Sequence, residues 1–543
     1  MKAKRPLPTE VLTFTGEHLN NRGQFLAMRD CGTPARCYGT APQDTALCML
    51  AGKKRGARQC HLRTVLEPGP DRCEIICPHF GYCGGCTYQH IDYSAQVALK
   101  AAPVEYMLRE QSHTAEILPA VLAPTPWYYR CKVEFSFIGD QLGFNIRGLF
   151  QRLINIEECF IGPPCNREVL AVVRNWQKKH AFIGWNPKTN SGFLRYLVIR
   201  SSSCTGEFLV TLVTATPQSF RLEDPGNPFQ ELAQELMQIR YAAGVLQVTH
   251  NGISPTTSAA ESEHLLAGRD SIKEQVNSLE FSLGWRSFFQ VNPPAYAHML
   301  RNIRAWVGKQ EKILDLYCGV GTIGLSMDGP VVGVESVPQA IEHAKRNAQR
   351  LHKQAEFYCA NSEDWPSLES SLLILDPPRH GCHPKLIERV AQEGPSHLLY
   401  ISCNYNKFFE EYQKLRQSYT IQKAQLYDFF PHTPHIETCV LLCREKVDTP
   451  DRRYIGVSYE PTDEEIVPHL SPSATYAELK QWIEEKYHTK VSSLYIAQVK
   501  AKHGLEMREN FNKPKSPNAK QPVVPVEKEK MIEDALRHFR MIE

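Results

Sequence analysis

The chain lacks the features that mark membrane and secreted proteins. It has no apolar run of the roughly 20 residues needed to cross a bilayer, and it does not begin with a segment typical of a secretory signal peptide. We therefore expect a cytoplasmic protein with no membrane partner. Its 18 cysteines should stay reduced, because disulfide scaffolds belong to secreted proteins.

The chain also lacks a large excess of charge of either sign. Its 62 Lys and Arg residues nearly balance its 59 Asp and Glu residues, and 42% of the chain is hydrophobic. This is the composition of an ordinary globular protein, and 543 residues are enough for three or four domains. We expect the protein to be a monomer.

The positive charge is concentrated near the N-terminus. Residues 1–72 carry twelve Lys and Arg against six Asp and Glu, between short β-type runs. The pattern predicts a small basic barrel of the OB type at residues 1–70, and barrels of this size commonly bind nucleic acid through phosphate contacts. The alternative is a solvated basic face.

A glycine-rich turn indicates a cofactor site. Gly319, Gly321 and Gly324 match G-x-G-x-x-G after a predicted strand, and Glu335 ends the next apolar run, twenty residues after Asp315. Glycines let a ligand approach the backbone, and such a carboxylate accepts hydrogen bonds from ribose hydroxyls. NAD and S-adenosylmethionine (SAM) both fit this pattern, and a plain turn is the third possibility.

Two more motifs follow apolar runs. Asp376-Pro377-Pro378 comes after residues 372–375, and Cys403 comes after residues 398–401. In a doubly wound α/β sheet the carboxyl ends of parallel strands meet at one edge, so a thiol, an acid and the glycine loop should converge there. An acid at this edge suits a pocket where a methyl donor meets a target base, which favours SAM over NAD. The alternatives are a buried, inert cysteine and a simple turn.

These motifs resemble those of a known family. Their order is that of the RNA uracil-5-methyltransferases, most similar to the branch that acts on 23S rRNA, and the resemblance extends over roughly residues 10–445. The five motifs are SFFQVN (287–292), DLYCGVGT (315–322), DPPR (376–379), YISCN (400–404) and FPHTPHIE (430–437). After Asn404 the chain departs from the family pattern, so the segment that follows the nucleophile should differ in shape.

The resemblance implies a set of site residues. It makes Cys403 the nucleophile that adds to carbon 6 of uracil, Glu437 the base that removes the hydrogen from carbon 5, and Asp376 a group that holds base and cofactor in register. The implied SAM-binding residues are Gln290, Tyr317, Thr322, Glu335, Asn361 and Asp376.

The resemblance also implies a fold and a substrate. We expect an α/β protein with a Rossmann-like SAM-dependent methyltransferase domain at residues 281–446, an N-terminal OB-like barrel of the TRAM type, and a central α+β RNA-binding region at residues 91–280. A C-terminal helical extension of unknown role, residues 447–543, lies outside the family pattern. The expected product is 5-methyluridine in 23S rRNA. A tRNA-directed enzyme and a catalytically silent RNA-binding or ribosome assembly factor are the alternatives.

A second cysteine motif indicates a metal site. Cys77, Cys83 and Cys86 fall within ten residues and are joined by glycines, a spacing that suits a metal ion or an iron-sulfur cluster. The resemblance supplies Cys159 as the fourth ligand and a [4Fe-4S] cluster bound by the loop at residues 71–90. Zinc is the alternative metal. The cluster needs no redox role, and we expect it to serve folding or RNA positioning.

The central region offers candidate RNA contacts. Arg130, Lys132, Arg195 and Arg200 could bind phosphate, whereas Phe135, Phe137 and Tyr196 could either stack on unpaired bases or belong to the core. This region should help to take uracil out of its stack, because carbon 6 is inaccessible within a duplex.

Overall fold

The computed structural model describes two compact units, residues 1–448 and 449–543, which we treat separately. The described residues are 8–19, 23–54, 56–149, 151–254, 257, 260–444, 476–503, 524–539 and 541–542. The part of the predicted C-terminal extension between residues 447 and 475 lies outside them. Among the described helices, none is both long and apolar enough to cross a membrane.

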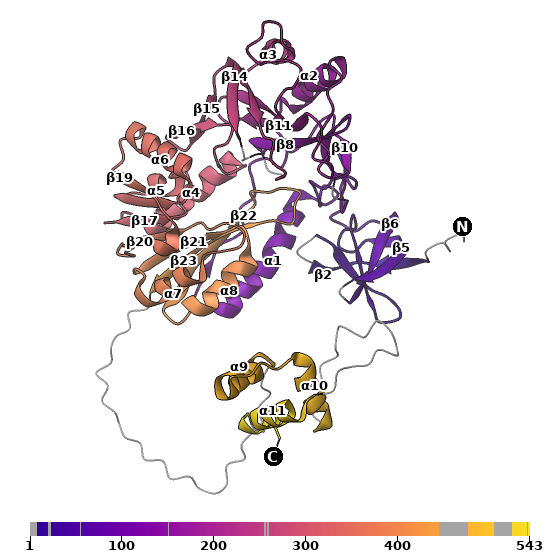
Figure 1. The fold of residues 1–543 in the computed structure, drawn as a ribbon, viewed down its shortest axis with the longest axis vertical. Helices are drawn as coiled ribbons and strands as arrows, with labels where there is room; N and C mark the ends of the chain where they lie inside the picture. The colour runs from indigo at the N-terminus through magenta and orange to yellow at the C-terminus, as the bar shows by residue number, and fades with distance from the viewer. Residues whose placement is uncertain are drawn as a thin grey trace. The chain divides into compact units, whose positions relative to one another are not determined.

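An eight-stranded sheet organises the first unit (Figure 1), in the order β19-β18-β17-β20-β21-β23-β22-β7. The five strands from β19 to β21 are parallel, and β23 runs antiparallel to both of its neighbours. The predicted Rossmann-like α/β fold is thereby confirmed. The strands are β7 (Glu116–Ile117), β17 (Ile313–Leu316), β18 (Val331–Glu335), β19 (Ala355–Cys359), β20 (Leu372–Leu375), β21 (His397–Ser402), β22 (Tyr419–Tyr427) and β23 (Glu437–Arg444).

Helices cover both faces of this sheet. In β20, Leu372 and Ile374 pack with α4, whereas Leu373 and Leu375 pack with α1, α7 and α8. Because both faces are buried, the central strands are continuous apolar runs, as the sequence predicted. The helices are α1 (Tyr93–Gln111), α4 (Pro293–Val307), α5 (Thr322–Ser326), α6 (Pro338–Arg350), α7 (Pro384–Glu393) and α8 (Tyr405–Leu415).

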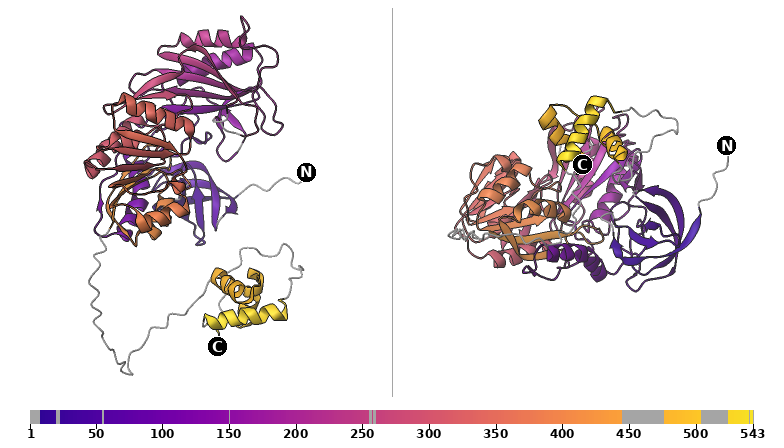
Figure 2. Two further views of the ribbon diagram at one scale, coloured as in Figure 1. Left: turned by 60° about the vertical axis from the view of Figure 1, so that its left-hand side comes forward. Right: turned by 90° about the horizontal axis from the view of Figure 1, so that it is seen from below.

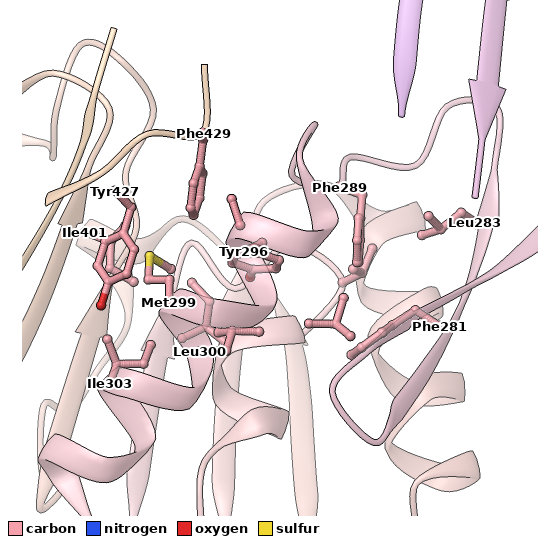
Figure 3. Packing of buried hydrophobic residues seen from close by; sticks show 14 of the residues in the cluster. Phe281, Leu283, Phe289, Tyr296, Met299, Leu300, Ile303, Ile401, Tyr427 and Phe429 are labelled. Carbon is pink, nitrogen blue, oxygen red and sulfur yellow. The ribbon is translucent and has the colours of Figure 1, made fainter. Parts of the chain in front are cut away.

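Helix α4 lies between the sheet and a β-hairpin, β15 (Ser271–Val276) and β16 (Leu279–Gly284). Figure 3 shows Met299 and Ile303 of α4 beside Ile401 and Tyr427, and Phe289 beside the hairpin residue Phe281. The loop of residues 285–292 therefore connects the hairpin to the N-terminus of α4, and its side chains Trp285 and Phe289 are buried in the same core.

Helix α1 packs on this eight-stranded sheet and is not part of the central region, although it falls within the predicted bounds of that region, residues 91–280. Its buried residues Ala101, Val104 and Leu108 share a core with β20 and β21, and β7 pairs with β22. The predicted start of the central region at residue 91 is thus too early.

The central region is built on a seven-stranded sheet in the order β10-β9-β8-β11-β12-β13-β14. Phe135 and Phe137 are buried in its core, so the idea that they stack on bases is wrong. The elements are β8 (Lys132–Ile138), β9 (Gln141–Asn145), β10 (Leu153–Asn155), β11 (Leu194–Ser201), β12 (Phe208–Thr214), β13 (Ala242–Thr249), β14 (Ser262–Gly268), α2 (Asn166–Lys179) and α3 (Pro228–Met237).

The N-terminal strands form a separate six-stranded sheet, which Figure 2 shows from two further sides. It curls around a core that includes Phe14 and Phe25. The strands are β1 (Thr9–Thr13), β2 (Thr15–Leu19), β3 (Phe25–Met28), β4 (Pro34–Cys37), β5 (Thr45–Lys54) and β6 (Ala57–Glu67).

The second unit contains the predicted C-terminal helices. They are α9 (Tyr476–Tyr487), α10 (Ser493–Lys502) and α11 (Val526–His538). Leu479, Ile496 and Leu536, one from each helix, are fully buried together. The helical character of the C-terminal extension is confirmed.

Candidate active site at the sheet edge

A cavity of about 1260 Å³ lies at the carboxyl edge of the parallel strands, where the strand order reverses between β17 and β20. Ligands of doubly wound sheets bind at this position, and the volume can hold a nucleoside cofactor with a second group. The structure brings motifs that are far apart in the sequence to this one cavity. Among its lining residues are Gln290, Tyr317, Thr322, Glu335, Asp376, Cys403 and Glu437.

The glycine loop is shaped by close backbone contacts. Gly321 has φ +81° directly before α5, a conformation that side-chain-bearing residues rarely adopt. The Gly324 N–H donates to Asp315 Oδ2 at 2.9 Å, and the Gly319 N–H donates to Glu335 Oε2 at 3.3 Å. The loop therefore presents backbone and the Glu335 carboxylate to one end of the cavity, which fits an adenosine cofactor.

Substitution of Gly324 by alanine should damage this loop. A Cβ at residue 324 would lie 2.8 Å from both Asp315 Oδ2 and Val331 Cγ1, and Asp315 is fully buried. We expect a loss of about 1–3 kcal/mol in the free energy of unfolding and at least about tenfold weaker binding of S-adenosylhomocysteine. Urea denaturation and calorimetry measure the two effects. Gly52→Ala in β5 is the control, because nothing lies within 4 Å of its Cβ position; equal behaviour of the two variants would contradict the prediction.

Three carboxyl groups lie at the site: Glu437 is buried and Asp376 half-buried in the cavity lining, and Asp315 is buried beneath the glycine loop. Burial raises the pKa of Asp315 and of Asp376 to about 7, and the Asp376 carboxylate adds to the effect on Asp315. Burial, followed by repulsion from Asp376, raises the pKa of Glu437 to about 8, although Arg379 lowers it. The site thus holds protons near neutral pH, and a bound cation would favour their release.

Cys403 enters the cavity from the end of β21. Its thiol is partly buried, and burial together with the Glu437 carboxylate raises its pKa to about 11, while Arg379 acts in the opposite direction. The Ser402 hydroxyl accepts the Asn404 N–H at 3.1 Å, and α8 begins at Tyr405. The thiol is therefore protonated in the protein alone, and a helix directly follows the nucleophile motif.

The structure departs from the predicted cofactor residues at Asn361. This residue is exposed, does not line the cavity, and donates from its amide to Asp364 at 3.1 Å. Conversely, Tyr296 on α4 lines the cavity and is buried, although no motif in the sequence singles it out. Burial and the nearby Asp376 and Asp315 raise the pKa of Tyr296 well above its ordinary value. In the sequence, Tyr296 is simply one residue of an amphipathic helix.

A second cavity of about 520 Å³ is lined by all four predicted metal ligands, Cys77, Cys83, Cys86 and Cys159. The Gly85 N–H donates to Cys83 Sγ at 3.4 Å, and buried Asn166 accepts the Cys159 N–H at 2.7 Å. However, among the residues that the structure describes, no three His, Cys, Asp or Glu side chains are arranged to hold a metal ion. The ligand geometry therefore does not support the predicted cluster.

The two cavities share a wall. Arg286, Ser287, Phe288, Phe289 and Val291 line both. Arg130, Lys132 and Arg200 also line the second cavity, although Arg200 is buried and donates to the Ser287 carbonyl. The SFFQVN motif therefore lies between the glycine loop and the loop of residues 71–90, which we call the cysteine loop.

The strand order, the reversed last strand and the glycine loop with Glu335 define the fold of SAM-dependent methyltransferases. Residues 332–445 match the family model described as tRNA (Uracil-5-)-methyltransferase. An uncharacterised RNA methyltransferase of Caldanaerobacter subterraneus is 30% identical over 450 residues, which cover 80% of this chain and 98% of that protein. The chain belongs to the RNA uracil-5-methyltransferase family.

The names of two further relatives specify tRNA as the substrate. The tRNA (uracil(54)-C(5))-methyltransferase of Pyrococcus furiosus is 30% identical over 401 residues, covering 73% of this chain and 92% of that one. The crystal structure of the Pyrococcus abyssi tRNA (uracil-54, C5)-methyltransferase, in complex with S-adenosyl-L-homocysteine, has a TM-score of 0.66 at 26% identity. The superposed residues cover 80% of this chain and 100% of the Pyrococcus abyssi chain.

Proposed function

We propose that the protein methylates carbon 5 of a uridine in structured RNA, with SAM as the methyl donor and Cys403 as the nucleophile. The observation that carries the proposal is that Cys403, Asp376 and Glu437 line the same cavity as the glycine loop. Thr322, Glu335 and Gln290 would hold the cofactor, because they line the end of the cavity formed by that loop and by the SFFQVN motif.

Methylation of carbon 5 needs a nucleophile and a base that act on the same uracil ring. Carbon 5 of uracil is a poor nucleophile, but addition of the Cys403 thiolate to carbon 6 turns the ring into an enolate whose carbon 5 is reactive. SAM, when bound, would supply the electrophilic methyl group to carbon 5 and leave as S-adenosylhomocysteine. Glu437 then takes the hydrogen of carbon 5 as a proton, the ring double bond forms again, and the bond between carbon 6 and Sγ breaks to release the thiolate.

The electrostatics of the site prepare Glu437 for this step. Its Oε2 atom is buried and has no hydrogen-bond partner among the described residues, so no hydrogen bond from that part of the chain compensates a negative charge on this atom. A carboxylate without such compensation is a stronger base than a solvated one. Arg379 at the cavity mouth acts against this and favours both the thiolate and the carboxylate.

The rate of methylation should rise steeply with pH. Cys403, with a pKa of about 11, and Glu437, with a pKa of about 8, must both lose a proton before they can act. Because the two groups act in separate steps, the logarithm of the rate of adduct formation should rise with a slope of about 1 over the whole range, whereas that of adduct breakdown should rise with a slope of about 1 only up to about pH 8. Rates measured between about pH 6 and pH 9 at saturating SAM test this; a flat profile would contradict the assigned roles.

Two RNA classes are supported as substrates. The order of the motifs and the cysteine loop resemble the 23S rRNA branch, which is our preferred substrate, whereas the relatives from Pyrococcus are named for tRNA. Incubation of the protein with SAM and either unmodified 23S rRNA or unmodified tRNA, followed by nucleoside mass spectrometry, separates them. Formation of 5-methyluridine in tRNA alone would overturn the rRNA assignment. No product in either RNA would favour the silent RNA-binding alternative.

We propose further that Cys77, Cys83, Cys86 and Cys159 hold a [4Fe-4S] cluster. The proposal rests on the spacing of the cysteines and on their lining of one cavity, and not on ligand geometry, since no three of the described side chains are arranged to hold a metal ion. The cluster would tie the loop of residues 71–90 to the central sheet, and no redox step is required. Iron and sulfide analysis of anaerobically purified protein tests the proposal; zinc without sulfide would overturn it.

A further inference from the structure

His432 lies in the loop between β22 and β23, five residues before Glu437, and it occupies a constrained position. It is 2% exposed and has φ +64°, in the left-handed region that residues other than glycine rarely enter. Such a conformation persists only when the surrounding structure holds it in place. Contacts from three separate parts of the chain do so here.

The first contact is with helix α1. The His432 N–H donates to Gln96 Oε1 at 3.0 Å, and Gln96 Nε2 lies 3.1 Å from His432 Nδ1. Because the amide nitrogen can only donate, Nδ1 accepts and Nε2 carries the ring proton. Burial and nearby Lys100 lower the pKa of His432 to about 3. The imidazole therefore stays neutral near neutral pH.

The second contact comes from the irregular segment that leads into β8 of the central sheet. The Trp127 ring lies over the imidazole, with centroids 4.0 Å apart, and the Tyr129 hydroxyl donates to the Pro431 carbonyl at 3.1 Å. Within the loop, the Thr433 hydroxyl donates to the Phe430 carbonyl at 2.8 Å. This internal bond closes residues 430–433 into one compact turn.

The third contact is with the cysteine loop. The His432 carbonyl accepts the N–H groups of Thr87, at 2.7 Å, and Tyr88, at 3.1 Å, the two residues directly after Cys86. Arg147 braces the same segment, since its guanidinium donates to the carbonyls of Cys83 and Cys86. A displacement of residues 83–88 would therefore move the turn at His432.

We propose that His432 is a positioning residue that joins the segment of residues 83–88 to Glu437. Through it, the conformation of the cysteine loop controls the proton abstraction that releases the methylated RNA. This inference rests on the proposed function, because it concerns the step assigned to Glu437. It predicts that a broken link slows the decay of the covalent adduct between Cys403 and RNA, and leaves its formation largely intact.

The test follows the adduct in a single turnover with the RNA that the protein methylates, by denaturing gel electrophoresis. In His432→Ala we expect the adduct to form at a rate close to that of the unmodified protein and to decay at least about tenfold more slowly. His432→Asn should restore much of the decay rate, because asparagine tolerates positive φ and its side-chain oxygen can accept from Gln96. His250→Ala removes another buried imidazole, in the central region, and should leave the adduct lifetime unchanged.

A double-variant cycle tests the connection to the cysteine loop. Arg147→Ala should prolong the adduct lifetime on its own and add nothing further in the His432→Ala background, because both act through one contact. Misfolding lowers the amount of adduct but not its lifetime. Glu437→Gln provides the reference: if this variant accumulates no adduct, the proposed function fails. If it does accumulate adduct while folded His432→Ala decays at the normal rate, the inference about His432 is overturned.

Discussion

Replacement of Cys403 by alanine is expected to abolish methylation, with a loss of at least about 10⁴-fold in turnover. Without the thiolate, carbon 5 of uracil keeps its low reactivity, and no other described cysteine lines the sheet-edge cavity apart from Cys318 of the glycine loop. Cys318 is buried, and burial and Asp315 raise the pKa of its thiol far above the ordinary value. It cannot substitute for Cys403.

The same variant should otherwise resemble the unmodified protein. Cys403 is only partly buried at the end of β21, so we expect a small change in the unfolding midpoint and unchanged binding of S-adenosylhomocysteine. Cys443→Ala on β23 is the matched control, since that thiol is also partly buried but contacts Gln422 away from the cavity. Covalent RNA adducts in Cys403→Ala, detected by gel electrophoresis, would refute its role as nucleophile.

The central strands could be predicted because their burial leaves a simple signal. Residues 372–375 and 398–401 are apolar throughout, and the structure has β20 at Leu372–Leu375 and β21 at His397–Ser402. Strands buried on both faces carry no polar alternation, and the polar residue that ends such a run lies at the sheet edge. This is why Asp376 and Cys403 could be assigned to one site.

The packing partners of the elements could not be predicted in the same way. The sequence indicates that α1 is a helix, but it does not say which surface covers Val104 and Leu108, and these residues pack on the catalytic sheet. The two-residue strand β7 is too short to leave any pattern. Tyr296 and His432 were missed for a related reason, because their importance comes from contacts with residues far away in the chain.

Glu437→Gln is expected to separate the two halves of the reaction. Glutamine has nearly the same shape but cannot take a proton from carbon 5, so the adduct with Cys403 should form and then persist. We expect turnover to fall about 10²–10⁴-fold and the covalent complex to accumulate on denaturing gels. Glu410→Gln is the control, because it makes the same substitution at a residue on the exposed face of α8. Loss of the adduct together with turnover would argue against Glu437 as the base.

The stability of Glu437→Gln should show how far the ionised Glu437 carboxylate lowers the free energy of unfolding. The pKa of Glu437 is raised from 4.5 to about 8, so the folded protein binds this proton more tightly than the unfolded chain does. The stability contributed by the protonated form is present below pH 4.5 and is lost as the pH rises to about 8. Glutamine does not ionise, so the variant should unfold at a higher temperature than the unmodified protein at pH 8.5, and the difference should shrink at pH 5. A stabilised but inactive variant would mean that the fold retains a buried, uncompensated carboxylate for the sake of the reaction; a destabilised one at pH 8.5 would contradict this reading.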